Sequence, residues 1–69
     1  MTGMEWIRLN YGVPASRGGR VRLGPGFAAD AGREGAITSS LEGRLRVRLD
    51  GDQRSVILHP TWEVEYLDA

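Results

Sequence analysis

The side chains with catalytic potential are few, and the sequence does not group them. His59 is the only histidine and cysteine is absent, so neither a His/Cys metal site nor a cysteine nucleophile can be assembled. Ser39 and Ser40 have no general base paired with them. Glu63 and Glu65 alternate on an expected strand and would lie about 7 Å apart, wider than the ~5 Å of a retaining glycosidase pair. We therefore predict a protein that is not an enzyme and that has no cofactor or metal site.

Arginines on an expected strand are the strongest binding candidates. The segment GRLRVRLDG alternates strictly and places Arg44, Arg46 and Arg48 on one face of that strand. Guanidiniums repeated about every 7 Å can follow phosphates or an acidic protein surface. Arg17, Arg20 and Arg22, on an earlier strand or just before it, could extend this patch. The alternative is a solvated face on which the arginine stems cover apolar surface.

Charge is balanced overall but uneven along the chain. Nine basic and nine acidic residues give a net charge of zero, and all nine basic residues are arginine. Between residues 8 and 48, eight arginines and three acids give +5, whereas five acids and one arginine from residue 50 onward give −4. A dedicated nucleic-acid binder usually carries a clear basic excess. The balance therefore argues against a phosphate-binding role.

A glycine-rich segment, GPGFAADAGREG, separates two expected strands between residues 24 and 35. It lacks the Gly-Lys-Ser/Thr signature of a phosphate-binding loop, so we predict a surface loop. Phe27 lies at its tip. The side chain is either an exposed contact for a partner or a cover over the end of the core, and the sequence leaves both alternatives open.

Period-two patterns and turn residues indicate five short strands. The turns are expected at Glu42-Gly43 and at Asp50-Gly51, because glycine accepts the positive φ of tight hairpins. The register of RSVILH (54–59) is ambiguous. The residues expected to point inward from the other strands are Val21, Leu23, Ile37, Leu41, Leu45, Val47, Leu49, Trp62, Val64 and Tyr66.

Closure of these strands into a small barrel is the expected architecture, because a barrel leaves no exposed sheet edge. The segment HPTW (59–62) is too short for a crossover helix and predicts a corner that brings the last strand onto the strand of Val21. That pairing would set Glu63 and Glu65 beside Arg20 and Arg22, with Trp62 plugging the interior. His59 is then interpreted as a structural residue at the corner. Residues 1–16 are expected to pack on the barrel as a short strand or as a turn that lays Trp6 and Ile7 on the core.

One segment, GGRVRLGPGFAADAGREGAI (18–37), resembles the KOW motif, which occurs on SH3-like barrels of ribosomal proteins and transcription elongation factors. An alternating strand leads to Gly26, and the loop closes on GREGAI, as in the family pattern. Five residues separate Gly26 from Gly32, where the family commonly has three, and Asp30 and Glu34 stand where RNA-binding members carry basic residues. The resemblance implies the barrel more directly than it implies RNA binding. The chain also resembles short prophage-encoded proteins, through YGVPA and LHPTWE.

With 69 residues, the chain is expected to form one domain, 1–69. It has no apolar run of membrane-spanning length and no signal-peptide core, so we predict a cytoplasmic protein without membrane contact. The predicted fold is all-β, a five-stranded SH3-like (KOW-like) barrel. The preferred function is a protein-interaction or assembly module that uses the 24–35 loop and Phe27. The alternative is an RNA- or DNA-binding module that uses the arginines at 44, 46 and 48.

Overall fold

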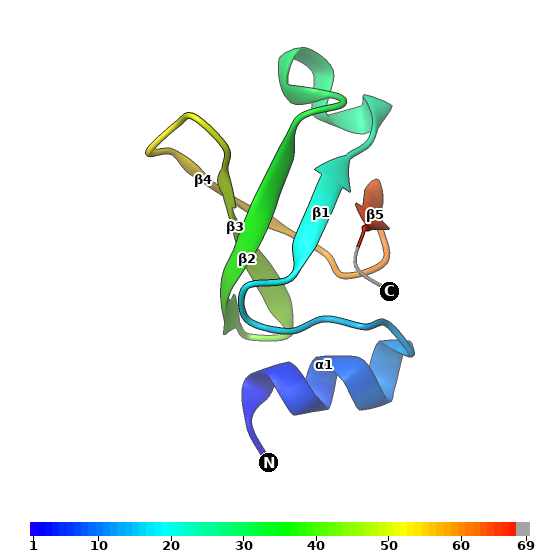
Figure 1. Cartoon of the computed structure of the whole chain (residues 1–69). Coiled ribbons are helices and arrows are strands. Elements are labelled where there is room, and N and C mark those ends of the chain that lie inside the picture. Colours follow the sequence, from blue (N-terminus) through cyan, green and yellow to red (C-terminus); the bar gives the residue numbers. More distant parts are fainter. Residues whose placement is uncertain (68–69) are drawn as a thin grey trace.

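The computed structural model describes residues 1–67, and it consists of one antiparallel sheet with a helix at its lower end (Figure 1). The predicted domain includes residues 68 and 69, which lie outside the described residues. The five strands are hydrogen-bonded in the order β4-β3-β2-β1-β5. The elements are α1 (Gly3–Tyr11), β1 (Arg20–Leu23), the 3₁₀ segment η1 (Pro25–Asp30), β2 (Glu34–Leu41), β3 (Arg44–Leu49), β4 (Ser55–Leu58) and β5 (Val64–Tyr66).

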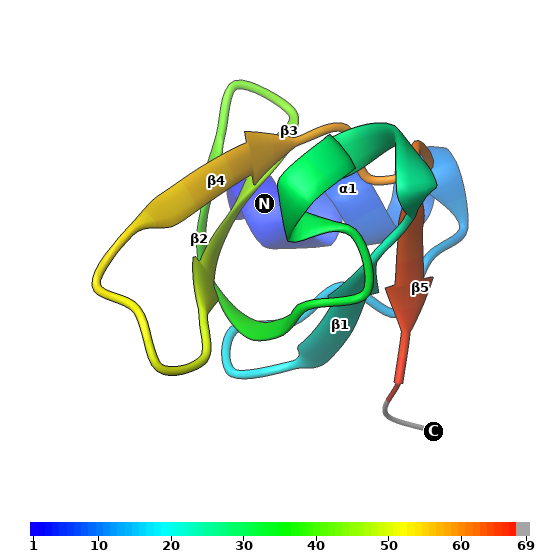
Figure 2. The same ribbon diagram turned by 90° about the horizontal axis from the view of Figure 1, so that it is seen from above.

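Strand β3 lies at the centre of the core and confirms the predicted alternation. Leu45, Val47 and Leu49 are fully buried, while the arginines between them are exposed. These side chains join six other buried residues in a single apolar cluster: Ile7, Ala15, Val21, Leu23, Ile37 and Leu58. Seen from above, the strands surround a common interior (Figure 2).

A β-bulge in β2 overturns the predicted direction of Leu41. The pairing with β3 shifts between Ile37 and Ser39, so Thr38 is an extra residue in the ladder. After an extra residue, each following side chain of the strand points to the opposite face of the sheet from the one that strict alternation predicts. Ile37 is buried as expected, but Leu41 is 44% exposed and Ser40 takes the inward position opposite Leu45.

The last strand pairs with the strand of Val21, as predicted. Val21 lies opposite Tyr66 and Leu23 opposite Val64, in antiparallel register. The sheet itself is not closed: its outer strands are β4 and β5, and within residues 1–67 no ladder joins them.

The prediction that Trp62 fills the interior is wrong, because its side chain is 52% exposed. Glu63 has a φ of 52°, in the left-handed region, so the strand alternation does not extend back from Val64 to Trp62. The interior at this corner is filled by half-buried Val64 and Tyr66 instead.

The N-terminal segment is a helix, which corrects the expectation of a strand or turn. The Thr2 hydroxyl accepts a hydrogen bond from the backbone N–H of Glu5, as an N-cap does. Gly12 ends the helix with a φ of 65°, a conformation that glycine adopts without steric cost. Ile7 is fully buried under the sheet, but Trp6 remains 42% exposed.

Tyr66 ties β5 to the corner that precedes it. Its hydroxyl donates a 2.7 Å hydrogen bond to the carbonyl oxygen of Pro60. Burial raises the pKa of Tyr66 to about 12, because the phenolate is poorly solvated there. The folded state therefore favours the neutral phenol.

Replacement of Tyr66 by phenylalanine is expected to lower the free energy of unfolding by about 1 kcal/mol at neutral pH, since the hydrogen bond is lost. The wild-type protein should lose further stability between its unfolded pKa, near 10, and the folded value of about 12, because only the unfolded chain ionises in that range. Tyr66→Phe should lack most of this alkaline loss. Urea unfolding at neutral and alkaline pH measures both effects, and an identical alkaline loss in the variant would contradict the assignment.

Candidate functional site

The arginine face, defined as the outer surface of β3 with Arg44, Arg46 and Arg48, is the most distinctive surface of the described chain. All three side chains are exposed, because the buried leucine and valine side chains of β3 force the intervening residues outward. The strand is interior to the sheet, paired with β2 on one side and β4 on the other. The guanidiniums are therefore attached to a fixed backbone.

Neutral residues flank the arginine face on both neighbouring strands. Arg46 lies opposite Ser39 of β2 and Ile57 of β4. Arg48 lies in the same way opposite Ala36 and Ser55. Among residues 1–67, no ion pair involves any of the three arginines of this face. The face thus carries three positive charges that the adjoining strands do not neutralise.

Arg20 and Arg22, which the sequence suggested could extend this patch, are both engaged by carboxylates. Arg20 faces outward on β1, two strands from Arg48, and donates to Asp50, with 2.9 Å between Nη1 and Oδ1. A side-chain hydrogen bond from Arg20 is the main reason that the pKa of Asp50 is lowered. Arg22 bridges Glu34 at 3.0 Å and Glu65 at 3.1 Å.

Hydrogen bonds to both carboxylates raise the pKa of Arg22, that to Glu34 being the larger cause. Its pairing with Glu65 is the one that the sequence predicted. The predicted pairing of Glu63 is wrong, because this side chain instead accepts a hydrogen bond from the backbone N–H of Gly26 at 3.2 Å.

Asp30 in the 24–35 loop and Asp52 in the turn between β3 and β4 form ion pairs inside the molecule. Asp30 accepts from Arg33 at 3.1 Å and from Arg54 at 2.8 Å. Asp52 accepts from the backbone N–H of Arg54, and this hydrogen bond is the first cause of its lowered pKa. These acids therefore do not oppose the arginine face, although in the sequence they argued against a phosphate-binding role.

Phe27 lies against the molecule rather than at a free tip. It is half-buried, packs on the core cluster and contacts Trp62, with 5.4 Å between the ring centroids. Gly26 is required here, since a Cβ on it would lie 2.7 Å from Cη2 of Trp62. Phe27 thus serves mainly as the cover over the core, and the exposed aromatic surface at this end belongs to Trp62.

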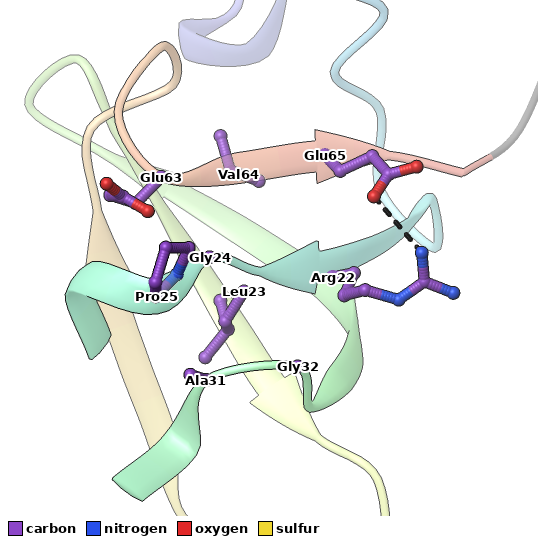
Figure 3. Close-up of a pocket in the computed structure, with 9 residues that line it drawn as sticks. All are labelled: Arg22, Leu23, Gly24, Pro25, Ala31, Gly32, Glu63, Val64 and Glu65. Carbon is purple, nitrogen blue, oxygen red and sulfur yellow. Dashed lines mark hydrogen bonds and ion pairs between the residues drawn. The ribbon is translucent and has the colours of Figure 1, made fainter. Parts of the chain in front are cut away.

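A shallow groove runs beside this aromatic pair, between β5 and the start of η1 (Figure 3). Apolar and small residues line it, and its ends carry Glu63 on one side and the Arg22–Glu65 ion pair on the other. The charges of Arg22 and Glu65 compensate each other. The carboxylate of Glu63 accepts a hydrogen bond from the backbone N–H of Gly26 but forms no ion pair within residues 1–67, so it leaves a negative charge at its end of the groove.

The glycines that carry the KOW resemblance have physical roles. Gly32 has a φ of 82°, which favours glycine. Gly35 lies in β2 so close to the backbone of Arg48 that a Cβ would overlap its carbonyl oxygen. These positions constrain the backbone and supply no binding group.

The other sequence candidates have structural contacts. His59 packs edge-on against Tyr11, with 4.9 Å between ring centroids, and its Nδ1 accepts a hydrogen bond from the backbone N–H of Thr61 at 3.2 Å. Ser40 lies against Gly3 of α1, and Ser39 lies beside Arg46. Within residues 1–67, no three histidine, aspartate or glutamate side chains are grouped so that they could hold a metal ion.

Trp6 is a surface residue that the sequence did not assign to any site. It extends from α1 to the β2–β3 turn, where a Cβ on Gly43 would lie 3.2 Å from its Cζ3. The signals that could have located it were the Thr-x-x-Glu N-cap and the Gly12 C-cap, which define α1.

Comparison with protein-family models, with curated proteins and with solved structures finds no match to the chain. Among the described residues, no helix has the length and apolar character needed to cross a membrane. Only the geometry of the surfaces is therefore left to indicate a function.

Proposed function

We propose that the protein is a small nucleic-acid-binding module whose contact surface is the arginine face. The observation that supports this most strongly is the contrast between the two sets of arginines. Arg20, Arg22, Arg33 and Arg54 are all engaged by carboxylates, whereas no carboxylate engages Arg44, Arg46 or Arg48 within the described residues. Arg8 and Arg17 also have no carboxylate partner there, but they lie beside α1 and do not form a row on one strand, and Arg8 donates a hydrogen bond to the carbonyl oxygen of Ala15. Zero net charge is compatible with this function, because a local field depends on where the charges lie.

The fold that we propose for this module is the SH3-like, KOW-like barrel. Three features support it: β2, β3 and β4 form a meander, β5 lies beside β1, and only residues 59–63 connect β4 to β5. In this arrangement the arginine face is the outer surface of the middle strand of the meander.

A salt titration tests the proposed function. Binding of the full chain to a fluorescein-labelled single-stranded oligonucleotide is followed by fluorescence anisotropy at several NaCl concentrations. Phosphate contacts on single strands each contribute about −0.7 to the slope of log K against log salt, so three contacts give about −2. Between about 50 and 200 mM NaCl, binding should weaken about 16-fold.

Arg46→Gln should reduce the magnitude of this slope by about 0.7, because one phosphate contact is lost. Arg17→Gln is the matched control. Arg17 is also exposed. The sequence suggested that it could extend the patch, but it lies outside β3 and lines a depression beside α1 with Gly3, Arg8 and Ser40. An equal change in the slope for both variants, or binding that does not respond to salt, would refute the proposal.

A second candidate function is protein interaction through the exposed Trp62 and the groove beside it. The supporting observation is an aromatic side chain, 52% exposed, that contacts Phe27 in a tilted geometry and directly precedes Glu63 of the groove. Tryptophan is common among the residues that dominate binding at protein interfaces. Such an interaction would depend on Trp62 and would be insensitive to Arg46→Gln, which separates it from the first proposal.

A further inference from the structure

We propose that the ligand of the arginine face is a single strand and that Trp6 stacks on one of its bases, an inference that depends on the proposed function. The row of arginines runs along β3 and ends at Arg44, directly after the Glu42-Gly43 turn. Gly43, with a φ of 81°, lies beside the indole of Trp6, so near that a Cβ added to Gly43 would lie 3.2 Å from Cζ3 of the ring. An aromatic ring therefore lies next to the end of the basic row.

The indole is fixed in place but not enclosed. Tyr11 contacts it in a T-shaped geometry, with 5.8 Å between centroids and 83° between the ring planes, and His59 packs on Tyr11 in turn. Trp6 nevertheless keeps 42% of its surface exposed, while Ile7 supplies the helix's contact with the core. A tryptophan that is held but half-exposed is suited to stacking, since little conformational entropy is lost when it binds.

The chemistry of single-strand recognition fits both parts of this surface. Proteins that bind single strands combine cationic side chains along the backbone with aromatic rings that accept bases, and this stacking tolerates any sequence. A duplex hides its base faces, and it is usually read by a helix or a two-stranded ribbon inserted into the major groove. Here β2 and β3 are held within a five-stranded sheet, with β1 paired to β2 and β4 paired to β3. The hairpin is therefore not free to enter a groove.

Two binding measurements test the inference. The probes are a fluorescein-labelled oligothymidylate of about twelve nucleotides, which is within the usual site size of small single-strand binders, and linear inorganic polyphosphate as a base-free competitor. Trp6→Ala should weaken oligothymidylate binding about tenfold and leave polyphosphate binding unchanged, because only stacking is lost. Leu9→Ala, at another exposed site on α1, should change neither.

Tryptophan emission gives a readout that requires no change at Trp6. In the Trp62→Phe variant, Trp6 is the only tryptophan, and its emission should be quenched by oligothymidylate but not by polyphosphate. In Trp6→Phe, the emission of Trp62 should not respond. Two results would overturn the inference: quenching of Trp6 by polyphosphate as strong as that by oligothymidylate, or a duplex of equal length that binds as tightly as the single strand. In either case the arginine face would remain an anion-binding surface. Failure of both probes to bind would overturn the proposed function as well.

Discussion

Replacement of Arg44, Arg46 and Arg48 by glutamine is expected to weaken oligonucleotide binding about 100-fold at about 50 mM NaCl. If each exposed contact with a phosphate contributes about 1 kcal/mol after screening, three contribute about 3 kcal/mol, which corresponds to two orders of magnitude in affinity. The fold should be preserved, because these side chains are exposed and make no ion pair within residues 1–67. Fluorescence anisotropy measures the affinity, and circular dichroism checks the fold.

A control of equal net charge separates the arginine face from overall charge. Ser16→Glu, Ala29→Glu and Thr61→Glu together also lower the net charge from zero to −3, at exposed positions outside β2, β3 and β4. This triple variant should lose much less affinity than the glutamine variant, since the local field over β3 is retained. Equal losses in the two variants would show that binding responds only to net charge.

Leu45→Ala should lower the free energy of unfolding by about 3 kcal/mol. Leu45 is fully buried on the central strand β3, opposite Leu58 of β4 and Ser40 of β2. Truncation of a buried leucine removes apolar contacts and leaves a cavity, which costs about 2–5 kcal/mol. A domain of this length has a total stability of only about 3–10 kcal/mol, so the variant should unfold at a clearly lower temperature and urea concentration than the wild-type protein.

Thermal and urea unfolding, followed by circular dichroism, measure this loss. Arg46→Ala, the next residue on the same strand, should change stability by less than about 0.5 kcal/mol, because its side chain faces solvent. Ile37→Val, at another buried site, should cost about 1 kcal/mol and keeps the comparison measurable if Leu45→Ala does not fold. A loss below 1 kcal/mol for Leu45→Ala would contradict the central position of this residue in the core.

The strand pattern was predictable where alternation runs unbroken from turn to turn. In β3, three buried and three exposed residues alternate without an irregularity, so both the core residues and the arginine face follow from the sequence. The antiparallel pairing of the last strand on β1 was also predictable, because a short corner leaves little choice of neighbour.

Two departures from alternation could not be predicted from periodicity. The bulge at Thr38 turns Leu41 outward, and the left-handed backbone of Glu63 separates Trp62 from the alternation of β5. Neither residue type prefers its observed conformation strongly enough to reveal it in the sequence. Both departures moved apolar side chains to the surface.

The ion pairs between arginines and carboxylates could not be predicted from the sequence either, because they depend on which strands become neighbours. Asp50 reaches Arg20 across thirty positions of the chain, and Arg54 reaches Asp30 across twenty-four. A count of charges along the sequence therefore suggested, wrongly, that these acids would repel phosphates from the arginines of β3. The tertiary structure pairs them with other arginines and leaves the row on β3 uncompensated.

The most direct test of the arginine face as a nucleic-acid contact surface is a nuclear magnetic resonance titration of the ¹⁵N-labelled full chain with a single-stranded oligonucleotide at low salt. We expect the largest shifts on the backbone amides and guanidinium Nε groups of Arg44, Arg46 and Arg48, with smaller shifts at Ser39 and Ile57 on the adjoining strands. Shifts centred on residues 26–27 and 62–63 while β3 stays unchanged, or no shifts at all, would contradict it.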